Sequence, residues 1–175
     1  MRIFALSDIH VDYDANAQWV GNLSRHEYRD DLLILAGDIT HRLDLLGWCV
    51  SALSVRFKQV LFVPGNHDLW VVGEERAKTS LQKFVDVQAT IEDSGASMGS
   101  FRRNGVHIVP LQSWYDYSFG QPSEDLMGMR SDYRACRWPA DFGPAEAAAH
   151  FAKMNSNLDT DGATRVITFS HFLPR

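Results

Sequence analysis

The sequence contains little cysteine and no long apolar segment. Its two cysteines, Cys49 and Cys136, lie far apart and form no CxxC pattern, so neither a zinc knuckle nor a disulfide framework is predicted, and both are expected to be free thiols. Residues 1–6 are followed at once by the polar Ser7 and Asp8, and this start is too short for a secretory apolar region or a membrane span. We therefore expect a cytoplasmic protein without a membrane partner.

The sequence also lacks a basic run and any long stretch of biased composition. The net charge of -5 comes from acidic residues dispersed along the chain, so a nucleic acid polymer is not expected as a partner. Only six prolines occur in 175 residues and no linker stands out, which favours a single domain over residues 1–175. A small phosphorylated substrate is compatible with the acidic surplus, because bound divalent cations reverse the local field.

Short apolar runs bounded by polar residues predict buried strands. They lie at residues 3–6, 32–36, 60–63, 106–111 and 166–169. Helical patterns at 15–28 and 43–57 separate the first three strands, which gives a βαβαβ unit and hence a parallel sheet. Further helices are predicted at 74–93 and 144–157. Residues 113–143 have no sustained period but carry many aromatic residues, which favours an ordered segment that covers a site.

Polar side chains follow four of these strands at the point where each strand ends. Asp8 and His10 follow the first, Asp38 the second, Asn66 and His67 the third, and His171 the last. Asp8 and His10 alternate with period two, so both point to one side of the chain. The carboxyl ends of parallel strands form the edge where open α/β sheets bind ligands. The sequence therefore predicts a metal site at this edge.

The types of ligand group limit which metal ions the predicted site would bind. Carboxylate, imidazole and carboxamide groups without a thiolate suit Mn, Fe, Zn or Ni, whereas an all-oxygen set would favour Mg or Ca. Two divalent ions about 3.5 to 4 Å apart, bridged by a carboxylate and a hydroxide, would clamp a phosphoryl group and supply its nucleophile. Asp38 is central in the set and is the predicted bridge.

The four motifs together resemble a known superfamily. Asp8-Ile9-His10, Gly37-Asp38, Gly65-Asn66-His67-Asp68 and Ser170-His171 are similar to the successive motifs of the calcineurin-like metallophosphoesterases. The resemblance implies an α/β fold of β-sheet layers flanked by helices. It also implies metal-dependent hydrolysis of a phosphomonoester or a phosphodiester.

The resemblance further assigns roles to the residues. Asp8 and His10 would hold the first metal, Asp38 would bridge, and Asn66 and His171 would hold the second metal. His67 would face the scissile ester and stabilise the transition state or protonate the leaving group. From its position alone, His67 is also compatible with a simple turn residue after Gly65.

Two departures from the superfamily matter. After Gly37-Asp38 the chain continues Ile39-Thr40-His41-Arg42, where protein serine/threonine phosphatases would have GDxxDRG, and Asp68 replaces their Glu. A protein phosphatase is therefore disfavoured. In the superfamily, further strands and a GHxH motif also follow the strand-end histidine and give one more ligand to each metal, whereas the printed sequence ends at Arg175.

The missing motif leaves three explanations open. The chain is part of a longer protein, a separate chain supplies the ligands, or the protein is a degenerate form. We expect an open apolar face or strand edge, covered by self-association or by a partner chain. The alternative function is a metal-binding or phosphate-binding subunit without turnover.

Three further residues are candidate substrate contacts. His41 lies three residues beyond the predicted bridge, although a surface position at the start of the next helix fits it equally well. Trp114 and Tyr115 follow a strand that borders the same edge and could shape a leaving-group pocket. Core packing is the alternative for both, because buried aromatic rings usually fill volume.

Overall fold

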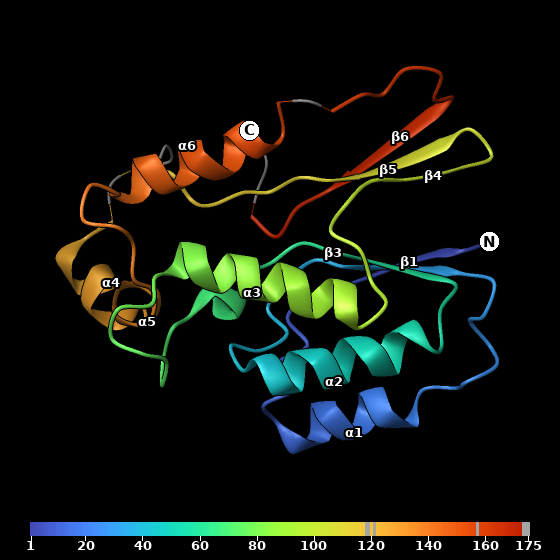
Figure 1. Ribbon diagram of the computed structural model, residues 1–175, viewed down its shortest axis with the longest axis horizontal. Helices are drawn as coiled ribbons and strands as arrows, with labels where there is room; N and C mark the ends of the chain where they lie inside the picture. The colour runs from blue at the N-terminus through green and yellow to red at the C-terminus, as the bar shows by residue number, and fades with distance from the viewer. Residues whose placement is uncertain (118–119, 121, 157, 173–175) are drawn as a thin grey trace.

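The computed structural model describes residues 1–117, 120, 122–156 and 158–172. Within these residues, two three-stranded sheets pack face to face and helices flank them (Figure 1). In chain order the elements are β1 (Ile3–Leu6), α1 (Asp14–Asn22), β2 (Leu32–Leu35), α2 (Leu43–Ser54), β3 (Gln59–Phe62), the 3-10 turn η1 (His67–Leu69), α3 (Ser80–Asp93), β4 (Phe101–Arg103), β5 (Val106–Pro110), α4 (Glu124–Met129), α5 (Asp132–Ala135), α6 (Pro144–Met154) and β6 (Arg165–Phe169).

The first sheet is parallel, with β2 between β1 and β3. All four side chains of β2 are buried, because alternate residues face different layers. Leu33 and Leu35 belong to the core that packs against the helices, whereas Leu32 and Ile34 belong to the core between the sheets. Burial on both faces explains why this strand is a continuous apolar run.

Helix α2 accounts for much of the core on the outer face of the first sheet. Leu46, Cys49, Val50 and Leu53 of this helix are fully buried, and α2 contacts α1, α3 and β3. A helix with neighbours on several sides has apolar residues around most of its circumference. This arrangement is visible in Figure 1, where α2 lies between α1 and α3.

The second sheet is mixed. Strand β5 pairs antiparallel with β4 and parallel with β6. Asn104 and Gly105 join β4 to β5 with φ angles of 50° and 77°, the left-handed geometry of a tight hairpin turn. Strand β6 is at the edge of the sheet among the described residues, and its Val166 is 44% exposed.

The predicted α/β class is confirmed, with the strands close to their expected positions. The strand β4 and the short helices α4 and α5 were not predicted. The helix predicted at 15–28 ends at Asn22, because the Ser24 hydroxyl accepts hydrogen bonds from the backbone N–H groups of His26 and Glu27 and forms a turn. The last residue predicted for α6, Asn157, lies outside the described residues.

Helix α3 begins six residues later than predicted, at Ser80 rather than Glu74. Thr79 and Gln82 form a capping box, which satisfies the free backbone N–H groups at the helix start. Glu74 stays outside the helix and pairs with Lys83 and Lys78. The charged residues before Thr79 therefore form a connecting loop.

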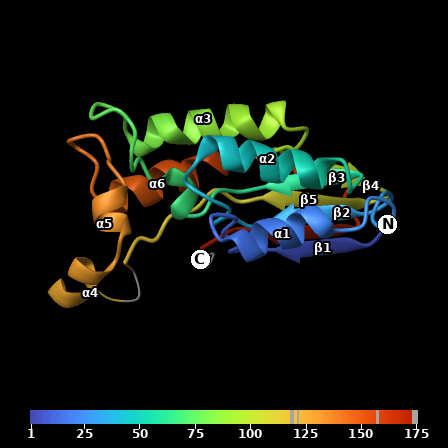
Figure 2. The same ribbon diagram turned by 90° about the horizontal axis from the view of Figure 1, so that it is seen from below.

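Helices α4 and α5 lie at one end of the molecule, beyond the carboxyl ends of the parallel strands (Figure 2). Between them and the sheets, Phe84 of α3, Trp114 and Phe151 of α6 form a separate buried cluster with Leu69 and Ala147. No helix among the described residues is long and apolar enough to cross a membrane.

Candidate metal centre and adjoining cavity

The loops after β1 and β2 run side by side. The backbone N–H of Asp8 donates to the carbonyl of Gly37 (3.0 Å), and that of His10 donates to the carbonyl of Asp38 (3.1 Å). Asp8, His10 and Asp38 have φ angles of 54°, 45° and 57°, a left-handed region that is costly for residues with a side chain. Such strain concentrates at functional sites, where the surrounding structure enforces it.

Asp68 fixes the loop after β2 to the loop after β3. Its side chain is completely buried and accepts hydrogen bonds from four backbone N–H groups, those of Asp38 (2.8 Å), Ile39 (2.9 Å), Thr40 (3.1 Å) and Gly65 (2.8 Å). Burial raises the pKa of Asp68 to about 6, although these N–H groups favour the carboxylate and oppose the shift. Asp68 was noted in the sequence because protein serine/threonine phosphatases have Glu at this position. In the structure it joins the two loops by these hydrogen bonds.

The structure brings the predicted site residues together. We call Asp8, His10, Asp38, Asn66, His67 and His171 the ligand cluster. Among the described residues, their His and Asp ligand atoms form two groups, Asp8 with Asp38 and His171, and His10 with Asp38 and His67, each within 4.8 Å. Asp38 belongs to both. The assignment of Asp8 and His10 to one metal, which the resemblance implies, stays a prediction.

His171, Asn66 and Asp38 direct acceptor atoms toward one another. Nδ1 of His171 lies 2.7 Å from the carbonyl oxygen of Ala36 and must carry the proton, because a carbonyl only accepts. In the neutral ring Nε2 then has a free lone pair, which faces Asn66 Oδ1 at 3.3 Å and Asp38 Oδ1 at 3.6 Å. Three acceptor atoms facing one another form a donor set that suits a cation, and histidine ligands of metals are commonly oriented in this way.

Asp132 of α5 was not singled out from the sequence, yet it holds two residues of the site. Its Oδ1 accepts hydrogen bonds from Asn66 Nδ2 (2.8 Å) and from Trp70 Nε1 (2.7 Å), and it is only 6% exposed. The bond to Nδ2 fixes the amide so that Asn66 Oδ1 faces His171. Trp70 in turn stacks on the His67 ring with centroids 3.8 Å apart.

His67 lies beside Asp38. Its backbone N–H donates to Asp38 Oδ1 (2.9 Å), and its Nε2 is 4.0 Å from Asp38 Oδ2. Burial lowers the pKa of the His67 imidazole, while the Asp38 carboxylate raises it by a smaller amount. A histidine ring at such a position can accept a proton when neutral and donate one when protonated.

The cysteines lie outside the ligand cluster. Both Cys49 and Cys136 are free thiols, as predicted. Burial raises the pKa of each to about 12, so both remain protonated near neutral pH and neither offers a thiolate. The ligand types at the centre are therefore carboxylate, imidazole and carboxamide.

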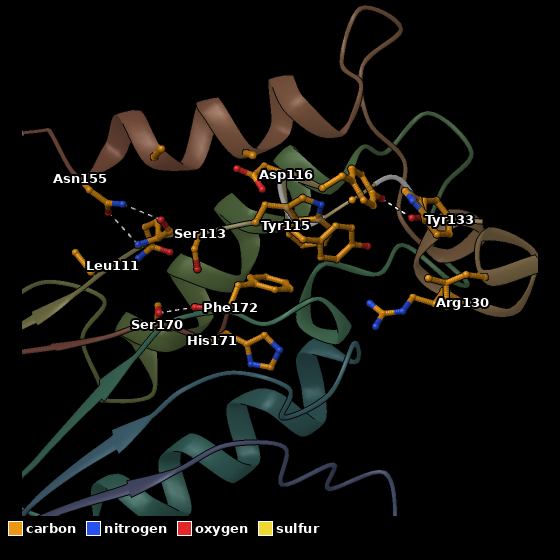
Figure 3. A pocket seen from close by; sticks show the side chains of 18 of the residues that line it. Leu111, Ser113, Tyr115, Asp116, Arg130, Tyr133, Asn155, Ser170, His171 and Phe172 are labelled. Atoms are coloured by element: carbon orange, nitrogen blue, oxygen red, sulfur yellow. Dashed lines mark hydrogen bonds between the residues drawn. The ribbon is translucent and has the colours of Figure 1, made fainter. Parts of the chain in front are cut away.

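A cavity of about 770 Å³ adjoins the ligand cluster at His171. We call it the aromatic cavity, because rings of Trp114, Tyr115, Tyr117, Tyr133 and Phe172 contribute to its lining. Figure 3 shows His171 and Phe172 on one side of it and Arg130 and Tyr133 of the α4–α5 region on another.

The three candidate substrate contacts have different positions. Trp114 is 7% exposed and belongs to the cluster around Phe151, yet it also lines the aromatic cavity, as does Tyr115. Core packing and contact with the cavity therefore coexist at Trp114. The His41 ring lies 6.1 Å from the Trp70 ring, measured between centroids. Trp70 in turn stacks on His67.

Comparison with known sequences and structures agrees with this geometry. The family model described as calcineurin-like phosphoesterase (Metallophos) matches residues 1–159. A protein of Mycobacterium tuberculosis named [acyl-carrier-protein] phosphodiesterase PptH is 30% identical over 125 residues. The matched region is 67% of this chain and 38% of that protein, so this chain spans well under half the length of its relative.

The same fold occurs in a solved structure. The crystal structure of the phosphopantetheinyl hydrolase PptH from Mycobacterium tuberculosis superposes with a TM-score of 0.69 and 24% sequence identity. The superposition covers 98% of this chain and 68% of that one. The sequence match over most of the chain, the shared fold and the ligand cluster at the strand ends lead to one conclusion: the chain belongs to the calcineurin-like phosphoesterase family.

Proposed function

We propose that the chain catalyses metal-dependent hydrolysis of a phosphodiester. The main support for this proposal is that two groups of ligand atoms share Asp38 and that Nε2 of His171 faces Asp38 and Asn66. The family supports phosphoester hydrolysis in general, and the relative named a phosphodiesterase favours a diester over a monoester.

In this proposal the ligand cluster would hold two divalent cations, with Mn, Fe, Zn or Ni as the candidates. Asp8, His10, Asn66 and His171 would be ligands, and Asp38 would be the ligand that both cations share. When bound, the two cations would stabilise the developing charge on the phosphoryl group and activate water as the nucleophile. The chain contributes the orientation of the ligands, through Asp68 and through the carbonyl of Ala36.

His67 is the proposed proton donor to the leaving oxygen in its protonated form, which the nearby Asp38 carboxylate favours. The bond from its backbone to Asp38 and the stacking of Trp70 hold the ring beside the bridge. A histidine held in this way supplies a proton to the leaving alkoxide and typically accelerates such a step by about 10²- to 10⁴-fold.

The names of the relative suggest the kind of diester. The relative is named an acyl-carrier-protein phosphodiesterase and a phosphopantetheinyl hydrolase, and these names indicate a phosphodiester with a pantetheinyl group. We propose for this chain a diester of the same kind, in which one ester arm is an elongated alcohol.

The test measures metal uptake and turnover together. Protein supplied with Mn²⁺ should bind about two ions per chain and hydrolyse bis(p-nitrophenyl) phosphate faster than p-nitrophenyl phosphate. Asp38→Asn should lower both metal uptake and turnover. Asp14→Asn is the matched control, because Asp14 is an exposed carboxylate at the start of α1.

Two outcomes contradict the proposal. Full turnover in Asp38→Asn would remove Asp38 as the bridge. Uptake of metal without hydrolysis of either ester would favour the binding subunit over the enzyme.

A further inference from the structure

We propose that the aromatic cavity binds the organic arm of the diester, an elongated alcohol built of short alkyl units joined by amide groups. This assignment rests on the phosphodiesterase function proposed above. It names the part of the molecule that would distinguish such a substrate from a small phosphate ester.

The position of the cavity supports this assignment. His171 belongs both to the ligand cluster and to the cavity lining, so an ester held at the cluster has its organic arm at the entrance of the cavity. From there the cavity extends past Phe172 and Tyr115 to Tyr133 and Arg130 (Figure 3). Its volume of about 770 Å³ lies in the range of sites for small organic ligands.

The wall beside His171 is apolar and firmly packed. The ring of Phe172 lies 5.2 Å from that of Trp114 and 5.3 Å from that of Tyr115, measured between centroids. Phe151 of α6 supports Trp114 from the core side. Stacked and edge-on rings of this kind offer a preformed surface to alkyl groups.

The opposite side offers a polar partner for an amide. Asn155 exchanges two hydrogen bonds with the backbone of Gln112, one accepted from its N–H (2.9 Å) and one donated to its carbonyl (2.8 Å). This fixes the segment, but the side-chain Oε1 of Gln112 is buried without a hydrogen-bond partner among the described residues. Gln112 lines the cavity, and an amide N–H of the occupant would satisfy this oxygen after a rotation of the carboxamide.

Small side chains on helix α6 leave space in the aromatic cavity for the organic arm of the diester. The residues that it presents to the cavity include Ala148 and Ala152, whose side chains are the smallest after glycine. Larger side chains at these positions would occupy the space proposed for the arm. Ala149 of the same helix is exposed and does not line the cavity, so it provides a matched control.

The first test compares two chromogenic diesters. One joins p-nitrophenol to phosphopantetheine, whose chain contains two amides, and the other is bis(p-nitrophenyl) phosphate. In Ala148→Leu and in Ala152→Leu, the ratio of kcat/KM for the pantetheinyl ester to that for the aryl ester should fall at least about tenfold. Ala149→Leu should retain the ratio of the unmodified protein. A ratio within about twofold of that value in both cavity variants would overturn the inference.

The second test needs no turnover. Pantetheine itself, which has no phosphate, should quench tryptophan fluorescence of the metal-free protein, with an apparent Kd raised at least about tenfold in Ala152→Leu and unchanged in Ala149→Leu. Binding of pantetheine without hydrolysis of either ester would retain the cavity assignment and refute the proposed function. Hydrolysis of the aryl ester together with no binding of pantetheine would refute the cavity assignment alone.

Discussion

The ligand cluster and the aromatic cavity adjoin each other but arise from parts of the chain with different construction. Residues 1–71 contribute the cluster except for His171, on loops between buried parallel strands. Residues 111–143 contribute most of the cavity, on an irregular segment with the two short helices α4 and α5. Backbone hydrogen bonds join the loops of the first part, whereas aromatic rings pack against one another in the second part.

This difference assigns different tasks to the two parts. Metal ligands need fixed positions, which strand ends and the hydrogen bonds of Asp68 supply. A pocket for an organic group needs shape, and loops carried by a rigid scaffold can vary in shape without loss of the fold. We therefore expect mutations in the first part to affect metal binding and mutations in the second to affect substrate selection.

The largest effect is expected for Asp68→Ala. Four backbone N–H groups would lose their acceptor inside the core, and a buried unsatisfied group costs about 1 to 3 kcal/mol. Allowing for entry of water, we expect the free energy of unfolding in urea to fall by at least about 4 kcal/mol, with loss of metal binding. Asp93→Ala, at an exposed position near the end of α3, should change it by less than about 0.5 kcal/mol. A similar small change in Asp68→Ala would show that these bonds do not hold the loops.

A smaller effect is expected for Phe151→Ala, which lies on α6 and packs against Trp114 of the second part. Phe151 is 1% exposed and packs against Phe84 and Trp114, and truncation of a buried phenylalanine costs about 3 to 5 kcal/mol. We expect a loss near the lower limit, about 3 kcal/mol, because the cluster borders the cavity and can relax into it. The exposed Lys153→Ala on the same helix is the control.

The same variant tests whether the two parts are independent. The affinity of Phe151→Ala for Mn²⁺, measured by calorimetry, should stay within about threefold of that of the unmodified protein. The reason is that the aromatic rings found around Phe151 among the described residues, those of Phe84, Trp114, Trp138 and His150, are not in the ligand cluster. A loss of metal affinity in proportion to the loss of stability would show that the cluster and the cavity form one cooperative unit.

The first part could be predicted from its sequence because its determinants are local. Each strand of the first sheet is a short apolar run, followed by a polar residue at the sheet edge, although β1 is only partly buried where the sequence predicted a buried strand. Parallel pairing then places Asp8, Asp38 and Asn66 at one edge. The central position of Asp38, which belongs to both groups of ligand atoms, follows from the same pairing.

The second part could not be predicted because its determinants are distant in sequence. Asp132 acquires its role from Asn66 and Trp70, which precede it by 66 and 62 positions, and no local pattern indicates such a pairing. Strand β4 has three residues, too few for a period. The Asn104-Gly105 pair was a usable indication of the β4–β5 hairpin, and it was missed.

Asp132 of the second part is hydrogen-bonded to Asn66 of the first, so its removal tests whether the metal site depends on the second part. Asp132→Ala would free the Asn66 amide to rotate, and loss of a group that orients a metal ligand typically lowers affinity or activity by about 10- to 100-fold. We expect this loss in affinity for Mn²⁺, together with a changed ¹H–¹⁵N side-chain signal of Asn66 in the metal-free protein. Asp132→Asn keeps an oxygen acceptor and should recover most of the affinity.

The control for Asp132 is Asp125→Ala, because Asp125 is an exposed carboxylate on the neighbouring helix α4. It should leave both the metal affinity and the Asn66 signal unchanged. If Asp132→Ala also leaves them unchanged, the position of Asn66 is set by the first part alone.

The smallest effect is expected for Glu74. It follows shortly after Val71, whose backbone N–H connects the two parts by donating to the carbonyl of Ala135 (2.8 Å). The carboxylate of Glu74 lies 2.5 Å from Lys83 Nζ, which is 1% exposed, and 3.0 Å from Lys78 Nζ. Hydrogen bonds from Lys83 and then Lys78 lower the pKa of Glu74 below its usual value. Because Glu74 is itself a quarter exposed, Glu74→Gln should cost only about 1 to 2 kcal/mol at pH 7.

The pH dependence distinguishes this ion pair from simple packing. A carboxylate with a lowered pKa stabilises the folded state above the pKa of an unfolded glutamate, about 4.3, and this stabilisation is lost as the pH falls through the lower folded value. Urea unfolding at about pH 7, 5 and 3 should therefore show a difference between the unmodified protein and Glu74→Gln that is constant at the first two values and shrinks at the third. The exposed Glu75→Gln should show no such trend. A difference that persists undiminished near pH 3 would mean that Glu74 stabilises the fold through its shape rather than its charge.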